Sequence, residues 1–205
     1  LLGQVGQVFI CVVPGGGRIV IRGGAGSAPG LGVRPGGCAL GAPWSPADAW
    51  DRPAPCEGWV ARDVVRHMVE WMPGFFGGAL VVPKGPSVDD DPAGAWQNLA
   101  DAVQAALDDP DVAASEFENR AGRYTVEDGV AIFCLADVLV HTWDLARATG
   151  LDEALDPDEV HRALVGITSF DEDLLRGSGQ YGARVDVPDD ADEQTRLLAY
   201  SGRQP

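Results

Sequence analysis

One apolar stretch, VAIFCLADVLVHTWDLARATG at residues 130–150, constrains the fold more than any other part of the chain. It is apolar on almost all sides at helical length, which predicts a central, buried α-helix. The stretch nevertheless carries Asp137 and His141, which are four residues apart and therefore share one helix face. Burying either polar group without a partner costs on the order of a few kcal/mol. Three kinds of partner would satisfy the two side chains: each other, a further polar group, or a metal ion. Helical spacing places both residues on one inward stripe, which consists of Val130, Cys134, Asp137, His141, Leu145 and Ala148.

Length, charge and cysteine content narrow the class of protein. A chain of 205 residues is long enough for one ordinary domain with its own core. The net charge of -16 argues against nucleic acid or an anionic membrane as a partner, because both would repel the chain. The four cysteines form no C-x-x-C pair, and no apolar run reaches the roughly 18 residues of a membrane helix. We therefore expect a cytoplasmic protein that acts on small molecules, metal cations or other proteins.

The first 43 residues differ in composition from the rest of the chain. They contain 13 of the 27 glycines and none of the 31 acidic residues. Residues 8–13 and 18–22 are β-prone, and the remainder is typical of a flexible arm. We interpret residues 1–43 as a Gly-rich segment that is disordered or not native to the domain, and residues 44–205 as the domain itself.

Cap residues and proline mark the predicted helices of the domain. The pairs Ser45-Pro46, Asp91-Pro92 and Asp156-Pro157 each combine a capping side chain with proline at the first helical position. Apolar residues recur at helical spacing after each of the last two pairs. No segment gives a convincing sheet pattern, so we predict an all-α domain of packed helices. The predicted helices are residues 60–76, 92–107, 130–150, a helix from 157 and a short one over 192–200, with an irregular connection at 112–124.

A histidine on a second helix extends the polar pair. His67 falls on the inward face of the helix predicted over 60–76. Together with Asp137 and His141 it supplies two imidazoles and a carboxylate, a ligand set found in open catalytic zinc sites. Such a metal deprotonates a bound thiol or lowers the pKa of a bound water. The same residues also fit a satisfied core histidine beside a buried Asp137–His141 pair, and the ligand types do not separate zinc, nickel, manganese and iron.

Three separated segments resemble a known family. They are PAPCEGW at 53–59 followed by RDVVRH at 62–67, the stretch VLVHTWDLARATG at 138–150, and a tail with VPDD at 187–190 and RLLA at 196–199. Residues 44–205 are similar to the actinobacterial metal-binding family that is related to the N-terminal domain of mycothiol-dependent maleylpyruvate isomerase, in the DinB-like superfamily. The resemblance implies a four-helix bundle with a divalent metal, zinc ahead of nickel, held between helices by His67, Asp137 and His141. It also implies that a low-molecular-weight thiol such as mycothiol attacks a small electrophilic substrate.

The chain departs from this family in three ways. Gly-rich sequence up to Pro43 takes the place of a full first helix, so we expect that helix to be truncated. Val60 stands where the family has a serine or threonine cap, which is expected to cost about 1 kcal/mol. Nothing corresponds to the second domain of the isomerase, so we do not predict maleylpyruvate as the substrate.

The leading interpretation is a metal- and thiol-dependent transferase or isomerase, with a homodimer among the oligomeric states considered. A non-catalytic metal-binding or stress-associated DinB-like protein is the alternative. The third interpretation is the same fold without metal.

Other residues invite functional interpretation with less support. Cys134 lies on the inward stripe, where packing is expected rather than ligation. His161 could complete a three-histidine site, but its place beside Arg162 favours a solvated face. Asp144 and Asp63 are candidates for groups that support a ligand from behind. Structural roles are expected for Cys56, Trp59, Trp143 and Arg147, the last as a surface ion pair.

Overall fold

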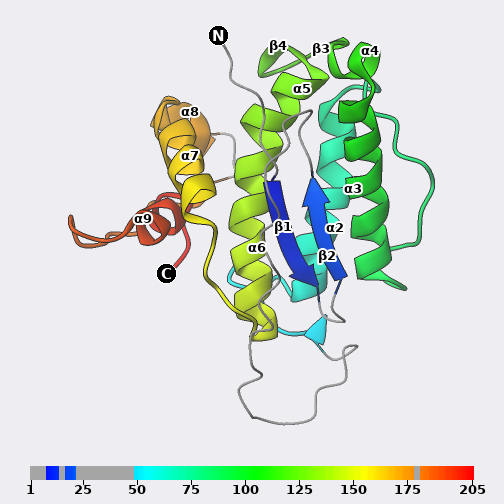
Figure 1. Ribbon diagram of the computed structural model, residues 1–205. Helices are drawn as coiled ribbons and strands as arrows, with labels where there is room; N and C mark the ends of the chain where they lie inside the picture. The colour runs from blue at the N-terminus through cyan, green and yellow to red at the C-terminus, as the bar shows by residue number, and fades with distance from the viewer. Residues whose placement is uncertain (1–7, 14–16, 22–48, 178–180) are drawn as a thin grey trace, which may run out of the picture.

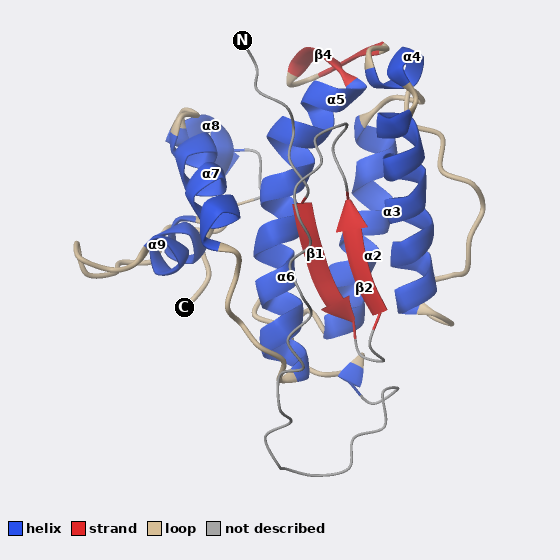
Figure 2. Ribbon diagram, viewed as in Figure 1, coloured by secondary structure: helices blue, strands red, loops and turns tan. Residues whose placement is uncertain are grey.

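The computed structural model describes residues 8–13, 17–21, 49–177 and 181–205 (Figure 1). Most of these residues lie in helices, and the two sheets among them have two short antiparallel strands each (Figure 2). The prediction of a mostly helical protein is therefore confirmed. The helix start predicted at Ser45-Pro46 lies outside the described residues and stays a prediction.

A continuous helical segment runs through the centre of the molecule. It consists of α5 (Val126–Gly129), the π-helical turn η1 (Val130–Cys134) and α6 (Leu135–Thr149). The Thr125 hydroxyl accepts a hydrogen bond from the Asp128 backbone N–H, so Thr125 caps the start of this segment. At the other end Gly150 has a φ of +74°, the left-handed geometry expected of a glycine that ends a helix. The π-helical turn was not predicted, and it lies immediately before the turn that carries Asp137.

This central helix is long enough to cross a membrane. Val126–Thr149 forms a 24-residue helix of sufficient length and hydropathy, so the expectation that no segment reaches membrane length is wrong. However, 61% of its most apolar window is buried inside the fold, as in the core helix of a soluble protein. It is the one such helix among the described residues.

Helix α2 (Ala61–Phe75) packs against α6 and supplies the second wall of the site. Val60 offers no side-chain oxygen to cap it, but the Asp63 carboxylate accepts the Val60 backbone N–H at 3.0 Å. This contact satisfies the backbone of the capping residue from inside the first turn. The buried face agrees with the predicted spacing and consists of Ala61, Val64, Val65, Met68 and Met72.

Helix α3 (Pro92–Asp108) lies on the other side of α2 from α6 (Figure 1). Its start is confirmed, because the Asp91 side chain accepts the Gly94 backbone N–H at 2.9 Å and Pro92 is the first helical residue. Residues of α2, α3, α5 and α6 together form the larger hydrophobic core. The α3 face in that core includes Trp96, Leu99, Val103 and Ala106.

The connection predicted as irregular at residues 112–124 is instead ordered. It contains the short helix α4 (Pro110–Ala113) and an antiparallel pair of strands, β3 (Glu116–Asn119) and β4 (Gly122–Thr125). Phe117 is buried and faces Tyr124 across the pair. A Cβ atom at Gly129 would lie 2.8 Å from the rings of Phe117 and Phe76, so the strand pair packs closely against the start of the central helix. Each strand has only four residues, too few for the alternation of apolar and polar residues to be recognised in the sequence.

A second strand pair lies within the N-terminal segment. β1 (Val8–Val13) and β2 (Gly17–Ile21) pair antiparallel, with β1 beside α6 and β2 beside α3 (Figure 1). These strands coincide with the two β-prone stretches of the sequence. The rest of the segment 1–43 lies outside the described residues, so its predicted disorder or foreign origin stays a prediction.

The C-terminal helices form a smaller layer on the side of α6 away from α3 (Figure 1). α7 (Pro157–Thr168) and α9 (Glu193–Tyr200) begin near the predicted positions and are capped by Asp156 and Asp192, whereas α8 (Glu172–Gly177) was not predicted. Together with one face of α6 they build a second hydrophobic cluster. Its buried members include Leu139, Val140, Trp143, Val160, Leu164, Ile167, Leu197 and Leu198.

Candidate metal centre

The three predicted ligands converge between α2 and α6. His67 comes from the middle of α2, and Asp137 and His141 come from successive turns of α6. Each residue contributes one possible ligand atom, and these atoms lie within 4.8 Å of one another. The structure therefore contains a group of side chains that could hold a metal ion, made of the residues that the sequence singled out.

The two histidines approach opposite oxygens of the same carboxylate. His67 Nε2 lies 3.6 Å from Asp137 Oδ2, and His141 Nε2 lies 3.6 Å from Asp137 Oδ1. Both separations exceed the 2.7–3.2 Å range of ordinary N–H···O hydrogen bonds. Two ligands on a tetrahedral zinc, each at about 2.1 Å, are separated by about 3.4 Å. The spacing thus fits the donor set of a metal better than a directly hydrogen-bonded histidine–carboxylate pair.

Asp137 is held by an indole from α2. Trp71 Nε1 donates a hydrogen bond to Asp137 Oδ2 at 3.0 Å. Burial alone raises the pKa of Asp137, but the imidazoles of His141 and His67 and the indole N–H outweigh it and hold the pKa below its usual range. Asp137 is therefore an ionised carboxylate at neutral pH, as a ligand must be.

His141 is oriented from behind by a second carboxylate. His141 Nδ1 lies 2.8 Å from Asp144 Oδ2, and Asp144 is fully buried. An ionised carboxylate only accepts, so Nδ1 donates to Asp144, and in a neutral imidazole the Nε2 lone pair then faces Asp137. Burial opposes ionisation of Asp144, but hydrogen bonds from His141 and Arg203 hold the pKa of its carboxyl below the usual range. A carboxylate behind a histidine is a common feature of metal sites, so the expectation for Asp144 is supported.

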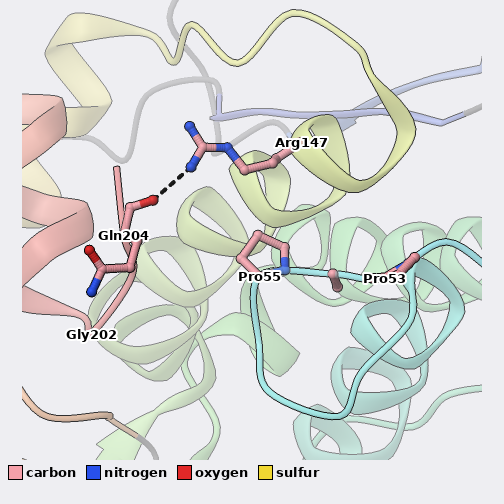
Figure 3. Close-up of a pocket in the computed structure, with 6 residues that line it drawn as sticks. Pro53, Pro55, Arg147, Gly202 and Gln204 are labelled. Carbon is pink, nitrogen blue, oxygen red and sulfur yellow. Dashed lines mark hydrogen bonds between the residues drawn. The ribbon is translucent and has the colours of Figure 1, made fainter.

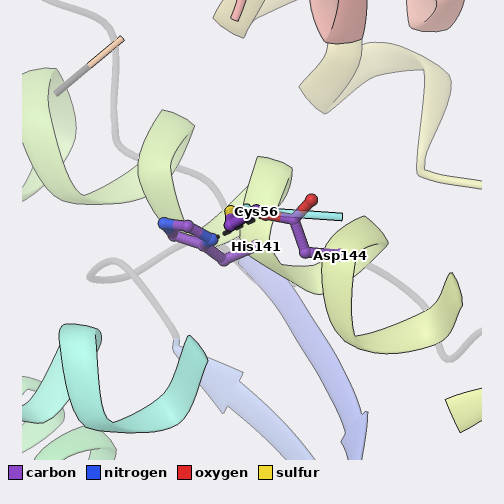
Figure 4. A group of neighbouring side chains, drawn as sticks. All are labelled: Cys56, His141 and Asp144. Atoms are coloured by element: carbon purple, nitrogen blue, oxygen red, sulfur yellow. Dashed lines mark hydrogen bonds and ion pairs between the residues drawn. The ribbon is translucent and has the colours of Figure 1, made fainter. Parts of the chain in front are cut away.

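Cys56 forms a second group of possible metal ligands with His141 and Asp144. Figure 4 shows these three side chains next to one another. Its Sγ lies 3.6 Å from Asp144 Oδ2 and 3.4 Å from Nη2 of Arg203. Burial, followed by the charge of Asp144, raises the pKa of the Cys56 thiol to about 11. Asp144 is already paired with Arg203, and Cys56 contacts both of these side chains. This group is therefore a hydrogen-bonded network behind the candidate ligands.

Aromatic rings enclose the histidines. The Trp59 ring lies 5.3 Å from the His67 ring and is stacked on the His141 ring at 6.0 Å, with 16° between the planes. The two imidazoles meet edge-on at 5.0 Å. Tyr181 is near enough for Asp137, after burial, to raise the pKa of its phenol to about 12, so the phenol is a hydrogen-bond donor at neutral pH. Trp59 packs against the larger core and also lies beside both imidazoles of the candidate centre.

The candidate centre is open to one side. The His67 and Asp137 side chains are 29% and 25% exposed, whereas His141 is only 6% exposed. A ligand from solvent therefore reaches the centre beside His67 and Asp137, and the buried side is closed by Asp144.

The structure places the other candidates away from this centre. Burial raises the pKa of Cys134 strongly, and it belongs to neither metal-ligand group, in agreement with a packing role. His161 is exposed and pairs with Glu193 at 3.0 Å, as its predicted solvated position requires. Asp63 serves the start of α2 rather than the centre.

Arg147 also lies outside the candidate centre. Its guanidinium pairs with Glu153 at 2.7 Å, as predicted, and it donates to the Gln204 carbonyl. Figure 3 shows the contact between Arg147 and Gln204 beside a surface pocket, none of whose lining residues is a candidate ligand. The pocket is lined by Pro53, Ala54, Pro55, Arg147, Gly202 and Gln204.

Sequence reasoning missed two residues that contact this group of side chains. Trp71 stands four residues after His67 on the same helix face, a spacing that could have identified it. Arg203 lies in a C-terminal segment with no local pattern that points to α6, so its position depends on tertiary contacts alone.

Fold and site together define a mostly helical protein with an interhelical group of possible metal ligands. Comparison with known proteins gives two relatives in Mycobacterium tuberculosis: uncharacterised protein MT0763 of strain CDC 1551 / Oshkosh and uncharacterised protein Rv0738 of strain ATCC 25618 / H37Rv. Each is 26% identical to this chain over 160 residues, which cover 77% of this chain and 86% of the relative. No family model and no solved structure matches the chain. Neither relative carries a name that states a function.

Proposed function

We propose that this chain is a DinB-like bundle protein that binds one divalent cation through His67, Asp137 and His141, with zinc ahead of nickel. One observation carries the proposal: two imidazole Nε2 atoms stand 3.6 Å from opposite oxygens of one ionised carboxylate. The contact of His141 Nδ1 with Asp144 adds support, because it leaves Nε2 as the ring nitrogen that faces the centre.

The proposed activity is a thiol-dependent transfer or isomerisation on a small electrophile. A bound zinc or nickel ion would supply Lewis acidity that lowers the pKa of a coordinated thiol. The resemblance to the mycothiol-dependent family supports a low-molecular-weight thiol as the cosubstrate. The exposed side of His67 and Asp137 gives that thiol a path to the centre. We include a cytoplasmic location in the proposal, and we leave nucleic acid out of it because the chain is strongly acidic.

Metal content of the purified full chain tests the binding step. We expect near-stoichiometric zinc or nickel by mass spectrometry in the parent and none in the double variant His67→Ala, His141→Ala. His161→Ala is the matched control, because it removes an exposed histidine that pairs with Glu193. Absence of metal from a well-folded parent, after incubation with zinc and with nickel, would reduce the cluster to core structure.

A second candidate function is a non-catalytic metal-binding or stress-associated protein. It would use the same three ligands and would differ from the first candidate in the absence of turnover. Thiol consumption by metal-loaded protein in the presence of small electrophiles distinguishes the two functions. The enzyme requires turnover that His67→Ala abolishes with the fold intact, whereas tight metal binding without turnover supports the alternative.

A further inference from the structure

The C-terminal segment reaches the candidate centre through one arginine. Arg203 follows α9, and its side chain is only 12% exposed. Its Nη2 donates to Asp144 Oδ2 at 2.8 Å and its Nε donates to Oδ1 at 3.3 Å. Nη2 also contacts Cys56, which precedes α2, so one guanidinium joins three segments that are far apart in the sequence.

We propose that Arg203 is a positioning residue that acts through Asp144 to hold His141 ready for metal binding. The inference rests on the proposed function, in which His141 Nε2 is a ligand. Asp144 accepts from both Arg203 and His141 Nδ1, and the two-pronged contact fixes the plane of the carboxylate. A fixed carboxylate in turn fixes the imidazole plane and keeps the proton on Nδ1.

Burial makes this arrangement dependent on Arg203. Asp144 is 0% exposed, so water does not replace a lost partner at its oxygens. Without the guanidinium, the remaining donors to Asp144 among the described contacts are His141 and the distant Cys56 thiol. The carboxylate is then free to rotate, and the orientation and tautomer of His141 are no longer set by a rigid neighbour.

Arg147 provides a matched control for the structural role of the C-terminal segment. It also anchors that segment, because its Nη1 donates to the Gln204 carbonyl, but it does not touch Asp144. Arg147→Gln therefore loosens the same segment without altering the carboxylate behind His141. An effect specific to Arg203 must be absent from this variant.

The first measurement is the tautomer of His141 in metal-free protein. Ring ¹⁵N chemical shifts distinguish protonated Nδ1 from protonated Nε2, and with three histidines in the chain His→Ala variants assign the signals. We expect a single Nδ1-protonated form in the parent and in Arg147→Gln, and a mixture of tautomers in Arg203→Gln. Retention of the single form in Arg203→Gln would overturn the inference.

The second measurement is zinc affinity by competition with a chelator. Loss of a group that orients a ligand typically weakens metal binding about 10- to 100-fold, and we expect that range for Arg203→Gln. Arg203→Lys keeps the charge without the two-pronged geometry, so it should show a smaller loss. Because Arg203 acts through Asp144, the double variant Arg203→Gln, Asp144→Asn should bind only as weakly as Asp144→Asn alone. Additive losses, or an equal loss in Arg147→Gln, would contradict the inference.

These results separate the inference from the proposed function. A parent that binds no zinc but shows the Arg203-dependent tautomer refutes the metal proposal and leaves the positioning of His141 intact. A parent that binds zinc with unchanged affinity in Arg203→Gln refutes the positioning role alone. If Arg203→Gln does not fold by circular dichroism, Arg203→Lys decides, and parental affinity in that variant overturns the inference.

Discussion

Removal of the Asp144 carboxylate should destabilise the metal-free protein strongly. Asp144 is 0% exposed, and its partner Arg203 is 12% exposed. Asp144→Ala would leave a buried guanidinium whose remaining contacts among the described residues are the Ser201 carbonyl and the Cys56 sulfur. Breaking a buried ion pair by removing one partner costs about 3–5 kcal/mol. We expect a loss in that range in the free energy of unfolding.

Urea unfolding at pH 7 in the presence of a chelator measures this loss. With a slope of about 2 kcal/mol per molar urea, a loss of 3–5 kcal/mol lowers the unfolding midpoint by about 1.5–2.5 M. Asp137→Ala is the matched comparison, because that carboxylate is 25% exposed and water replaces part of its interactions. We expect its cost to stay near 1 kcal/mol. A loss below about 1 kcal/mol for Asp144→Ala would refute the reasoning, since it would mean that water reaches Arg203 when the carboxylate is gone.

Three further predictions concern single residues. Asp192→Ala should cost about 1 kcal/mol at pH 7, since Asp192 accepts the Thr195 backbone N–H at the start of α9. This hydrogen bond lowers the Asp192 pKa in the folded state, so its contribution to stability is complete above the unfolded pKa and is lost as the pH falls through the folded pKa. Asp192→Asn should show no such pH dependence in thermal unfolding. Cys56, with a pKa of about 11, should react with iodoacetamide about 100-fold more slowly at pH 8 than a thiol of pKa 9, and rapid labelling of folded protein followed by peptide mass spectrometry would contradict its burial. Gly150→Ala should lower stability by about 1 kcal/mol because its φ is +74°, and an unchanged melting temperature would show that the end of α6 relaxes without strain.

The sequence was sufficient to predict the helical framework where local signals are strong. Proline after an aspartate marked the starts of α3 and α7, and Gly150 marked the end of the central helix. These signals act within a few residues of backbone, so a linear pattern contains them completely. The strand pair β3–β4 was missed for the opposite reason. Its formation depends on Phe117 packing against the central helix, a contact made outside the strands themselves.

The residues of the candidate centre also fall into those that local spacing predicts and those that only tertiary contacts place. Asp137, His141 and Asp144 lie within eight residues of one helix, and their spacing of four and three residues is enough to place them in a row. His67 followed from the apolar face of α2 alone. By contrast, Arg203 reaches Asp144 across 59 residues and Cys56 across 147, and no periodicity describes such contacts.

This division also explains why the sequence could not choose between a buried ion pair and a metal centre. Had His141 donated directly to Asp137, the i, i+4 pair would have satisfied itself and no further partner would be needed. Instead its Nδ1 faces Asp144, and its Nε2 stands 3.6 Å from an Asp137 carboxylate that Trp71 already holds. The ion pair and the metal centre both place Asp137 and His141 on the same helix stripe. They differ in which imidazole nitrogen of His141 is hydrogen-bonded to a group outside this pair. In the structure Asp144 contacts Nδ1, an arrangement that supports the metal centre we propose, and Arg203 pairs with Asp144 at 2.8 Å.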